Sequence, residues 1–264
     1  MKVFHEPSLS STNTVLKSRL ETRRYRRLPV ALTADGQTAG RGVGPNVWCS
    51  DPGANALFSM AFRPSFLEAE HQFLLNMALS LSMLHTLNAW WKETRGADGG
   101  DGAPFTLKWP NDLYMGEKKL GGILFELSVM GRHCAWAVMG VGVNVNQGCF
   151  PSELPNPAAL CMSGADVIDM PALRRRFIAR AARDYRRLER RARHQSAAVL
   201  LQRYKAAYLK RLLFLGQMRT YICLGERMSA RLTGVDDYGQ ALVEAADGRR
   251  FSCGLKELKY VFEN

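Results

Sequence analysis

Runs of hydrophobic residues divide most of the chain into strands and helices. Compact apolar runs predict buried strands, whereas apolar residues that recur every three or four positions predict amphipathic helices. Strands are expected at residues 28–34, 54–62, 105–109, 120–127 and 133–146. Helices are expected at residues 13–20, 70–91, 173–188 and 197–213. This mixture predicts an α+β domain in which helices cover a sheet.

From residue 217 the pattern changes to short alternating runs, at residues 220–223, 228–234, 240–245 and 249–262. Asp237-Tyr238-Gly239 and Asp247-Gly248 supply turns between them. We therefore expect two domains, residues 1–214 and residues 215–264, of which the second is a small β domain. Residues 96–103, GADGGDGA, are expected to form a flexible insertion in the first domain.

The stretch from Lys108 to Leu124, KWPNDLYMGEKKLGGIL, has the most chemical content. Pro110 ends an extended segment because it has no N–H to donate, and Gly116 lets the chain reverse. The hairpin expected here carries groups suited to a phosphate ester and its metal ion: Lys108, Asn111, Asp112, Lys119, Gly121 and Gly122. A lysine at a strand end is more often a solvated charge, so the interpretation depends on the joint spacing.

Two further segments carry candidate ligand-binding groups. Ser11-Thr12-Asn13 precedes the first helix, where a hydroxyl is ordinarily an N-cap worth about 1 kcal/mol. Residues 35–51 contain four glycines within nine residues, which expose backbone N–H groups, and Arg41 can bind phosphate or carboxylate through two parallel hydrogen bonds. Without the arginine, such a loop is commonly a surface turn.

The net charge of +12 is concentrated in one segment. Residues 171–211 hold twelve Arg and two Lys against Asp184 and Glu189 alone. The apolar positions expected to face inward there are Leu173, Phe177, Ala181, Tyr185 and Leu188. A solvated arginine-rich helix face is the ordinary explanation. Steering of an acidic protein substrate and binding of nucleic acid are the functional alternatives.

The remaining composition excludes several classes of protein. The six cysteines include no CxxC pair, so neither a zinc site nor a disulfide framework is indicated, and the reducing cytoplasm is the expected location. No apolar run approaches the roughly 18 residues that a membrane span needs, and the N-terminus lacks a signal-peptide hydrophobic region. We expect no membrane association. His71 and His85 are expected to be surface and packing residues and not metal ligands.

Taken together, the motifs resemble the catalytic core of biotin protein ligases. The matching blocks, in the order and roughly the spacing of that family, are Ser11–Asn13, Gln37–Gly42 followed by Trp48, Lys108–Asp112, Lys119–Leu124 and Gly140–Asn146. The resemblance implies a class II synthetase-like catalytic domain, a mixed β-sheet backed by helices, followed by an SH3-like β-barrel. It also implies an ATP-dependent ligase that forms biotinyl-5′-AMP from biotin and ATP. Such a ligase then transfers biotin to a lysine of a biotin carboxyl carrier protein, a subunit of acetyl-CoA carboxylase.

The same resemblance assigns roles to individual residues. It makes Lys119, Arg41 and Asp112 the catalytic groups, and Asp112 is also the candidate ligand of Mg²⁺. Biotin is expected to contact Ser11, Thr12, Asn13, Gln37, Gly40, Arg41, Gly42, Val43, Lys119, Gly121 and Gly122. ATP is expected to contact Arg41, Asn46, Trp48, Lys108, Asn111, Lys119 and Asn144.

The glycine-rich loop departs from the family's pattern. Loops in the family commonly continue after Gly42 with further arginines, whereas this chain has Val43, Gly44, Pro45 and Asn46. Each missing charge-assisted hydrogen bond is worth about 1.5 to 3 kcal/mol. We therefore expect a weaker hold on the adenylate, and faster leakage of it, than in a ligase with the arginine-rich loop.

Three alternatives stay open at the level of sequence. A lipoate or octanoate ligase would keep acyl-adenylate chemistry but need a channel for an alkyl chain, and a weakly active biotin-binding paralogue would keep only binding. A DNA-binding repressor needs a recognition helix. The chain reaches Ser11 after ten residues, so we expect no specific DNA binding. The resemblance also allows a homodimer.

Overall fold

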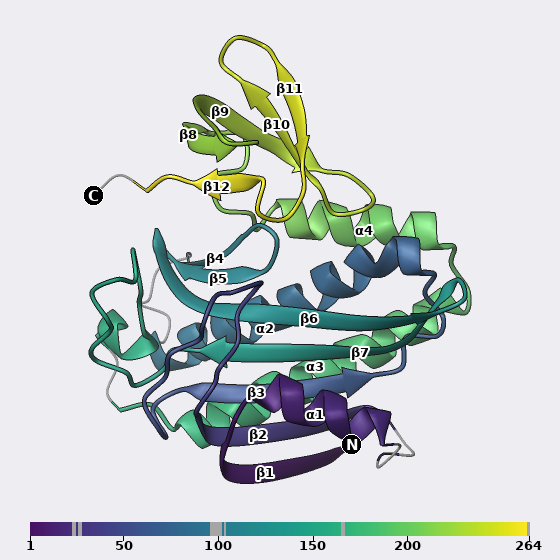
Figure 1. Ribbon diagram of the computed structural model, residues 1–264, viewed down its shortest axis with the longest axis vertical. Coiled ribbons are helices and arrows are strands. Elements are labelled where there is room, and N and C mark those ends of the chain that lie inside the picture. The colour runs from purple at the N-terminus through teal and green to yellow at the C-terminus, as the bar shows by residue number, and fades with distance from the viewer. Residues whose placement is uncertain (23–24, 26–27, 96–101, 103, 165–166, 263–264) are drawn as a thin grey trace.

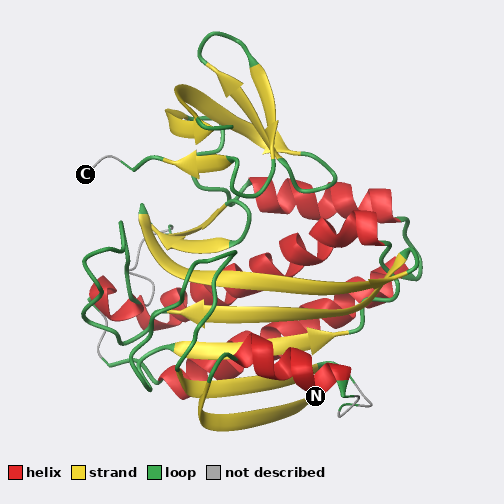
Figure 2. Cartoon of the chain, in the orientation of Figure 1, coloured by secondary structure: helices red, strands yellow, loops and turns green. Residues whose placement is uncertain are grey.

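The computed structural model describes residues 1–22, 25, 28–95, 102, 104–164 and 167–262 (Figure 1). Within these residues the chain forms a seven-stranded mixed sheet and a five-stranded antiparallel sheet, with helices between and behind them (Figure 2). The insertion expected at residues 96–103 lies outside the described residues, apart from Gly102. The α+β prediction, with a mixed sheet backed by helices, is confirmed.

The first sheet has the strand order β1-β2-β3-β7-β6-β5-β4. Its strands are β1 (Lys2–Leu9), β2 (Val30–Gln37), β3 (Ala56–Phe62), β4 (Phe105–Lys108), β5 (Asp112–Met115), β6 (Lys118–Met130) and β7 (His133–Val143). β1 and β2 are parallel, and the other neighbours are antiparallel. The helices are α1 (Thr12–Glu21), α2 (Gln72–Arg95), α3 (Met170–Ala192) and α4 (Ala197–Leu209), with short 3₁₀ turns at Ala69–His71 and Leu160–Ser163.

The central strand β3 shows how the helices are divided between the two faces of the sheet. Phe58 packs against Phe177 of α3, with ring centroids 6.3 Å apart, whereas the hydroxyl of the next residue, Ser59, hydrogen-bonds to α1. Successive side chains of a strand point to opposite faces. Helix α1 therefore covers one face, and α2 and α3 cover the other (Figure 1).

Helix α3 is the arginine-rich helix, and its apolar positions face inward as predicted. Leu173, Phe177, Ala181, Tyr185 and Leu188 are all buried. One arginine is buried with them. Arg174 donates hydrogen bonds to Ala34 O (2.8 Å) and Asp35 Oδ1 (3.3 Å), which satisfies the charge it brings into the core.

The predicted hairpin at residues 105–127 is instead a three-stranded meander. Asp112 begins β5, which pairs with β4 on one side and β6 on the other, although a loop was expected at this position. Only Trp109, Pro110 and Asn111 separate β4 from β5, and Gly116, with φ of 57°, makes the second turn. β5 was not predicted because its four residues, DLYM, are too few to show a periodicity.

The N-terminal strand β1 was not predicted, and it changes the extent of β2. No residue of Lys2–Leu9 is buried, so the strand lacks the apolar run or alternation by which a buried strand is predicted. β1 pairs in parallel with β2 as far as Leu9 and Gln37. Asp35, Gly36 and Gln37, which were expected to lie in the glycine-rich loop, are therefore part of a strand.

The C-terminal strands form an open sheet with the order β11-β10-β9-β8-β12. Their bounds are β8 (Met218–Cys223), β9 (Glu226–Val235), β10 (Ala241–Ala245), β11 (Arg250–Cys253) and β12 (Leu258–Tyr260). Pairing between β11 and β12 would close a barrel, and the strand pairings of the described residues do not include it. The domain boundary predicted at residue 214 falls between the end of α4 and the start of β8, and it stays a prediction.

All six cysteines are free thiols. Cys223 and Cys253, both buried inside the C-terminal sheet, share a hydrogen bond with their sulfurs 2.8 Å apart. None of the described helices has the length and hydropathy required to cross a bilayer.

Replacing Phe177 with alanine tests the packing of α3 on the sheet. The ring is completely buried, so Phe177→Ala is expected to lower the free energy of unfolding by about 3–5 kcal/mol. Arg183→Ala, on the exposed side of the same helix, should change it by less than about 0.5 kcal/mol. Equilibrium unfolding in guanidinium chloride measures both. A loss below about 1 kcal/mol for Phe177→Ala would contradict this packing.

Candidate active site

A cavity of about 230 Å³ opens on the α1 side of the large sheet. Its wall is made by the start of α1, the loop after β2, the turn between β4 and β5, the central strands β6 and β7, and the connection between β11 and β12. Fourteen of the predicted site residues line it: Ser11, Thr12, Asn13, Gln37, Arg41, Gly42, Val43, Asn46, Trp48, Lys108, Asn111, Asp112, Lys119 and Gly122.

The start of α1 forms a polar corner of the cavity. Ser11 occupies the N-cap position, but its side chain makes no capping hydrogen bond, contrary to the ordinary expectation for such a hydroxyl. Thr12 uses both its backbone N–H (2.7 Å) and its hydroxyl (3.0 Å) to donate to Gln37 Oε1. The side chains of Thr12 and Gln37 are thereby fixed against each other, and the Ser11 hydroxyl stays available to a ligand.

Asn13 is held by two residues that the sequence analysis did not select. Its Oδ1 lies 2.7 Å from the hydroxyl of Ser59, and its Nδ2 donates to Glu126 Oε2 (2.9 Å). Ser59 interrupts the apolar run of β3, and Glu126 interrupts that of β6. A polar residue inside an otherwise apolar strand was therefore the signal that would have found both.

The central strands carry very small residues where they face the cavity. A Cβ atom added to Gly140 would lie 2.4 Å from Asn13 Oδ1, and one added to Gly142 would lie 2.5 Å from the indole of Trp48. The loop after β2 crosses in front of β6 and β7 in Figure 1, and it carries Trp48 into this space. The Trp48 Nε1 is buried without a hydrogen-bond partner in the described part of the chain.

The acidic side chain in the cavity wall is shared between two lysines. Asp112 Oδ2 lies 2.8 Å from Lys119 Nζ and 3.9 Å from Lys108 Nζ. The Lys108 ammonium also lies 4.9 Å from the ring centroid of Tyr260, which belongs to the C-terminal sheet. Burial lowers the pKa of Lys108, and the Lys119 charge acts in the same direction, while Asp112 opposes both.

Arg41 reaches the cavity from the loop after β2. Its Nη1 lies 3.4 Å from Glu126 Oε1, and 46% of its side chain is exposed. Arg41 and Lys119 line the same cavity, and each forms an ion pair with a carboxylate, Arg41 with Glu126 and Lys119 with Asp112. A cavity whose cations outnumber its acidic side chains is suited to an anionic ligand.

Three predicted site residues do not line the cavity: Gly40, Gly121 and Asn144. A Cβ at Gly40 would lie 2.3 Å from Trp48 O, and one at Gly121 would lie 2.6 Å from Gly142 O, so both glycines are required by close backbone packing. Asn144 donates to Ala158 O (2.9 Å), and its buried Oδ1 has no partner among the described residues. Contact of these residues with biotin or ATP stays a prediction.

The C-terminal sheet contributes Leu255, Lys256 and Leu258 to the cavity wall, which the sequence analysis did not anticipate. Trp109 Nε1 donates to Gly239 O (3.0 Å), a contact that fixes the sheet against the turn after β4. No local pattern predicts such a contribution, because the contact joins segments about 130 residues apart in the chain.

The sequence profile of the biotin/lipoate A/B protein ligase family matches residues 6–144, over half of the chain. The chain belongs to this family. All the blocks that carried the resemblance begin inside the matched residues, and Asn144 is the last residue matched. The profile thus covers the described wall of the cavity except for its C-terminal part.

Curated relatives of this family member are ligases. The bifunctional ligase/repressor BirA of Bacillus subtilis is 32% identical over 142 residues, 52% of this chain and 40% of the relative. The biotin–[acetyl-CoA-carboxylase] ligase of Mycobacterium tuberculosis is 29% identical over 150 residues, 56% of this chain and 51% of the relative. The aligned part thus spans about half or less of these relatives.

Solved structures of the family extend the similarity to nearly the whole chain. The biotin protein ligase from Aquifex aeolicus in complex with biotin and ATP is 25% identical with a TM-score of 0.74, and the match covers 98% of this chain and 97% of that one. The Leishmania major biotin protein ligase in complex with biotinyl-5-AMP has the same fold, at 19% identity and a TM-score of 0.57, covering 96% and 99%.

The cavity wall offers limited ligands for Mg²⁺. Asp112 is the one carboxylate among the lining residues, all of which are described, and Asn111 is an amide neighbour. Mg²⁺ in nucleotide sites is commonly held by one or two carboxylates together with substrate phosphates and water. The residues therefore fit an ion that is bound largely by the phosphates, and they do not form a complete protein cage.

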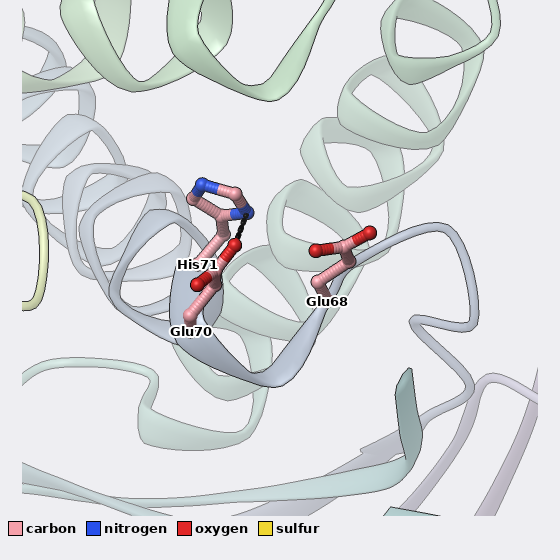
Figure 3. A group of neighbouring side chains, drawn as sticks. All are labelled: Glu68, Glu70 and His71. Atoms are coloured by element: carbon pink, nitrogen blue, oxygen red, sulfur yellow. Dashed lines mark ion pairs between the residues drawn. The ribbon is translucent and has the colours of Figure 1, made fainter. Parts of the chain in front are cut away.

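A second group of potential metal ligands lies away from the cavity, before α2. Side-chain atoms of Glu68, Glu70 and His71 lie within 4.8 Å of one another (Figure 3). His71 lies 3.9 Å from Glu70, and Glu68 lies 3.7 Å from Arg132. Glu68 thus already has a cationic partner in Arg132, and such surface groups are common without an ion, so we assign the group no role.

Gly142→Ala tests whether Trp48 occupies the hollow over the central strands. The added methyl group displaces the indole, so the Trp48 fluorescence should shift to the red, and stability should fall by about 1–3 kcal/mol. Recording each spectrum with and without Trp48→Phe isolates the signal of this indole from the other tryptophans. Gly148→Ala is the control, since a Cβ there meets nothing within 4 Å. An unchanged Trp48 signal would contradict the placement.

Proposed function

We propose that the protein is an ATP-dependent biotin protein ligase. The observation that carries the proposal is that one cavity joins a polar corner, Thr12 with Gln37, to a cluster of cations that includes Arg41 and Lys119. The polar corner suits the ureido ring of biotin, which has two N–H donors and a carbonyl acceptor. The cationic cluster suits the phosphates of ATP. The complex of the Aquifex aeolicus ligase with biotin and ATP supports the pairing of these ligands.

In the first step, a biotin carboxylate oxygen forms a bond to the α-phosphorus of ATP, and the bond to pyrophosphate breaks. Both reactants are anions, so the protein's task is to neutralise and align them. Lys119 contacts the biotin carboxylate and the α-phosphate, and Arg41 contacts the phosphates. When the substrates bind, Lys119 exchanges its ion pair with Asp112 for one with a substrate anion, and Arg41 does the same with Glu126. Mg²⁺, when bound with ATP near Asp112, neutralises phosphate charge.

In the second step, a lysine amine of the carrier protein attacks the carbonyl carbon of the anhydride, and AMP leaves. The amine must lose a proton, and Asp112 is the carboxylate in the cavity wall that is available to accept it. Its two roles, proton acceptor and Mg²⁺ ligand, belong to different steps. The carrier is a biotin carboxyl carrier protein of acetyl-CoA carboxylase, a choice supported by the name of the Mycobacterium tuberculosis relative.

We also infer that residues 215–264 act as the SH3-like domain of the resemblance and that residues 1–214 form the catalytic domain. The five antiparallel strands of the C-terminal sheet support this division. The proposal includes a cytoplasmic location, with which six free thiols are compatible. Specific DNA binding is not part of the proposal, and a homodimer remains compatible with it.

A lipoate or octanoate ligase is the competing function, because the family's description includes lipoate ligases. The two activities differ in the acid that is adenylated. Lipoate, octanoate and biotin should therefore be compared as partners of MgATP in a pyrophosphate-release assay. Pyrophosphate release with biotin but not with lipoate or octanoate supports the proposal, and release with the alkyl acids contradicts it. Release with none of the three acids is the result expected of a paralogue that only binds biotin.

Lys119→Ala tests the adenylation mechanism. Loss of the ammonium between two anions is expected to reduce biotin-dependent ATP–pyrophosphate exchange by about 10²–10³-fold. Lys118→Ala is the matched control, since Lys118 neighbours it in β6 but does not line the cavity. Mass spectrometry of a carrier domain incubated with biotin and MgATP should show biotinylation by the control variant and not by Lys119→Ala. Equal activity of the two variants would remove Lys119 from the mechanism.

A further inference from the structure

The C-terminal sheet presents one lysine to the cavity on a rigid turn. Lys256 lies between β11 and β12 and lines the cavity. Its φ of 80° is a conformation that few residues other than glycine adopt. The turn is held by Glu257, whose N–H donates to Gly254 O (3.0 Å) and whose carboxylate accepts from the Gly254 N–H (2.6 Å). These two hydrogen bonds fix the backbone of the turn that carries Lys256.

The Lys256 ammonium lies against the glycine-rich loop. A Cβ added to Gly44 would lie 2.7 Å from Lys256 Nζ and 3.0 Å from its Cε. Gly44 also has a positive φ of 66°, a backbone conformation that favours glycine. The absence of a side chain at Gly44 lets a cation from the C-terminal sheet approach the loop backbone.

Lys256 differs from the other cations of the cavity in having no acidic partner. Arg41 rests on Glu126, and Lys119 and Lys108 share Asp112. Within the described residues, no carboxylate lies at ion-pair distance from Lys256. The Lys256 ammonium at the cavity wall therefore has no carboxylate of the protein to displace before it binds an external anion.

We propose that Lys256 is a substrate-binding residue for the phosphate chain of ATP. This inference rests on the proposed function in one respect, that the anion bound in the cavity is a nucleotide triphosphate. The loop residues Val43, Gly44 and Asn46 carry no charge, so Lys256 supplies from the C-terminal sheet a cation that the loop lacks. As a point charge it binds phosphate oxygens without requiring a fixed orientation. The C-terminal sheet thereby becomes part of the nucleotide site.

Three variants test this role: Lys256→Gln, Lys256→Arg and Lys259→Gln. In biotin-dependent ATP–pyrophosphate exchange, Lys256→Gln should raise the KM of ATP about tenfold or more and leave the KM of biotin unchanged. Lys256→Arg should restore most of the affinity for ATP because it restores the charge. Lys259→Gln, on β12 outside the cavity wall, should behave as the unmodified protein. A general structural defect would change both KM values and would not be rescued by arginine.

Calorimetric titration of the same four proteins with ATP alone separates this inference from the proposed function. If the unmodified protein catalyses the exchange and Lys256→Gln has the same KM for ATP, the proposed role of Lys256 is overturned. Absence of biotin-dependent exchange, combined with ATP binding that weakens in Lys256→Gln, overturns the ligase assignment and supports the phosphate site. Failure of the unmodified protein to bind ATP overturns both.

Discussion

The alternation of side chains across the central strands is the constraint on which the rest of the structure depends. On one face of β3 and β7, residues such as Phe58 and Met139 pack with α2 and α3 into a continuous core. On the other face the same strands present Ser59, Gly140 and Gly142. Because successive side chains of a strand point to opposite faces, the sheet can be tightly packed on the face toward α2 and α3 and leave a cavity on the face toward α1. The cavity is a consequence of this division.

Charge balance is the second constraint on the site. Lysines gathered in a partly desolvated cavity repel one another and lose hydration, so the arrangement needs anions. In the structure these are protein carboxylates: Asp112 serves Lys119 and Lys108, and Glu126 serves Arg41. The proposed substrates, like these carboxylates, are negatively charged. Binding can therefore proceed by exchange of one anionic partner for another, which reduces the cost of desolvating the cations.

Docking of the C-terminal sheet makes it part of the same site. The strand β4 shares backbone hydrogen bonds with the segment that leads into that sheet, between Leu107 and Arg211 and between Leu213 and Leu107, both 2.8 Å. The Tyr208 hydroxyl donates to Pro110 O (2.6 Å), in the turn that precedes Asp112. These contacts fix the turn that precedes Asp112 to α4 and fix β4 to the segment that leads into the C-terminal sheet. The position of Lys256 at the cavity depends on the same contacts.

The sequence by itself determined the elements whose periodicity is long or whose apolar runs are compact, including α3, with Phe177 inward, and β3. It also determined most of the cavity wall, because the motif residues lie near strand and helix ends that a sheet brings together. Only the tertiary structure decided which partners these residues have. The contacts of Asn13 with Ser59 and Glu126 and the approach of Lys256 to Gly44 join segments distant in the chain. Local pattern depends on neighbouring residues, whereas such contacts depend on how whole elements pack, so no local pattern contains them.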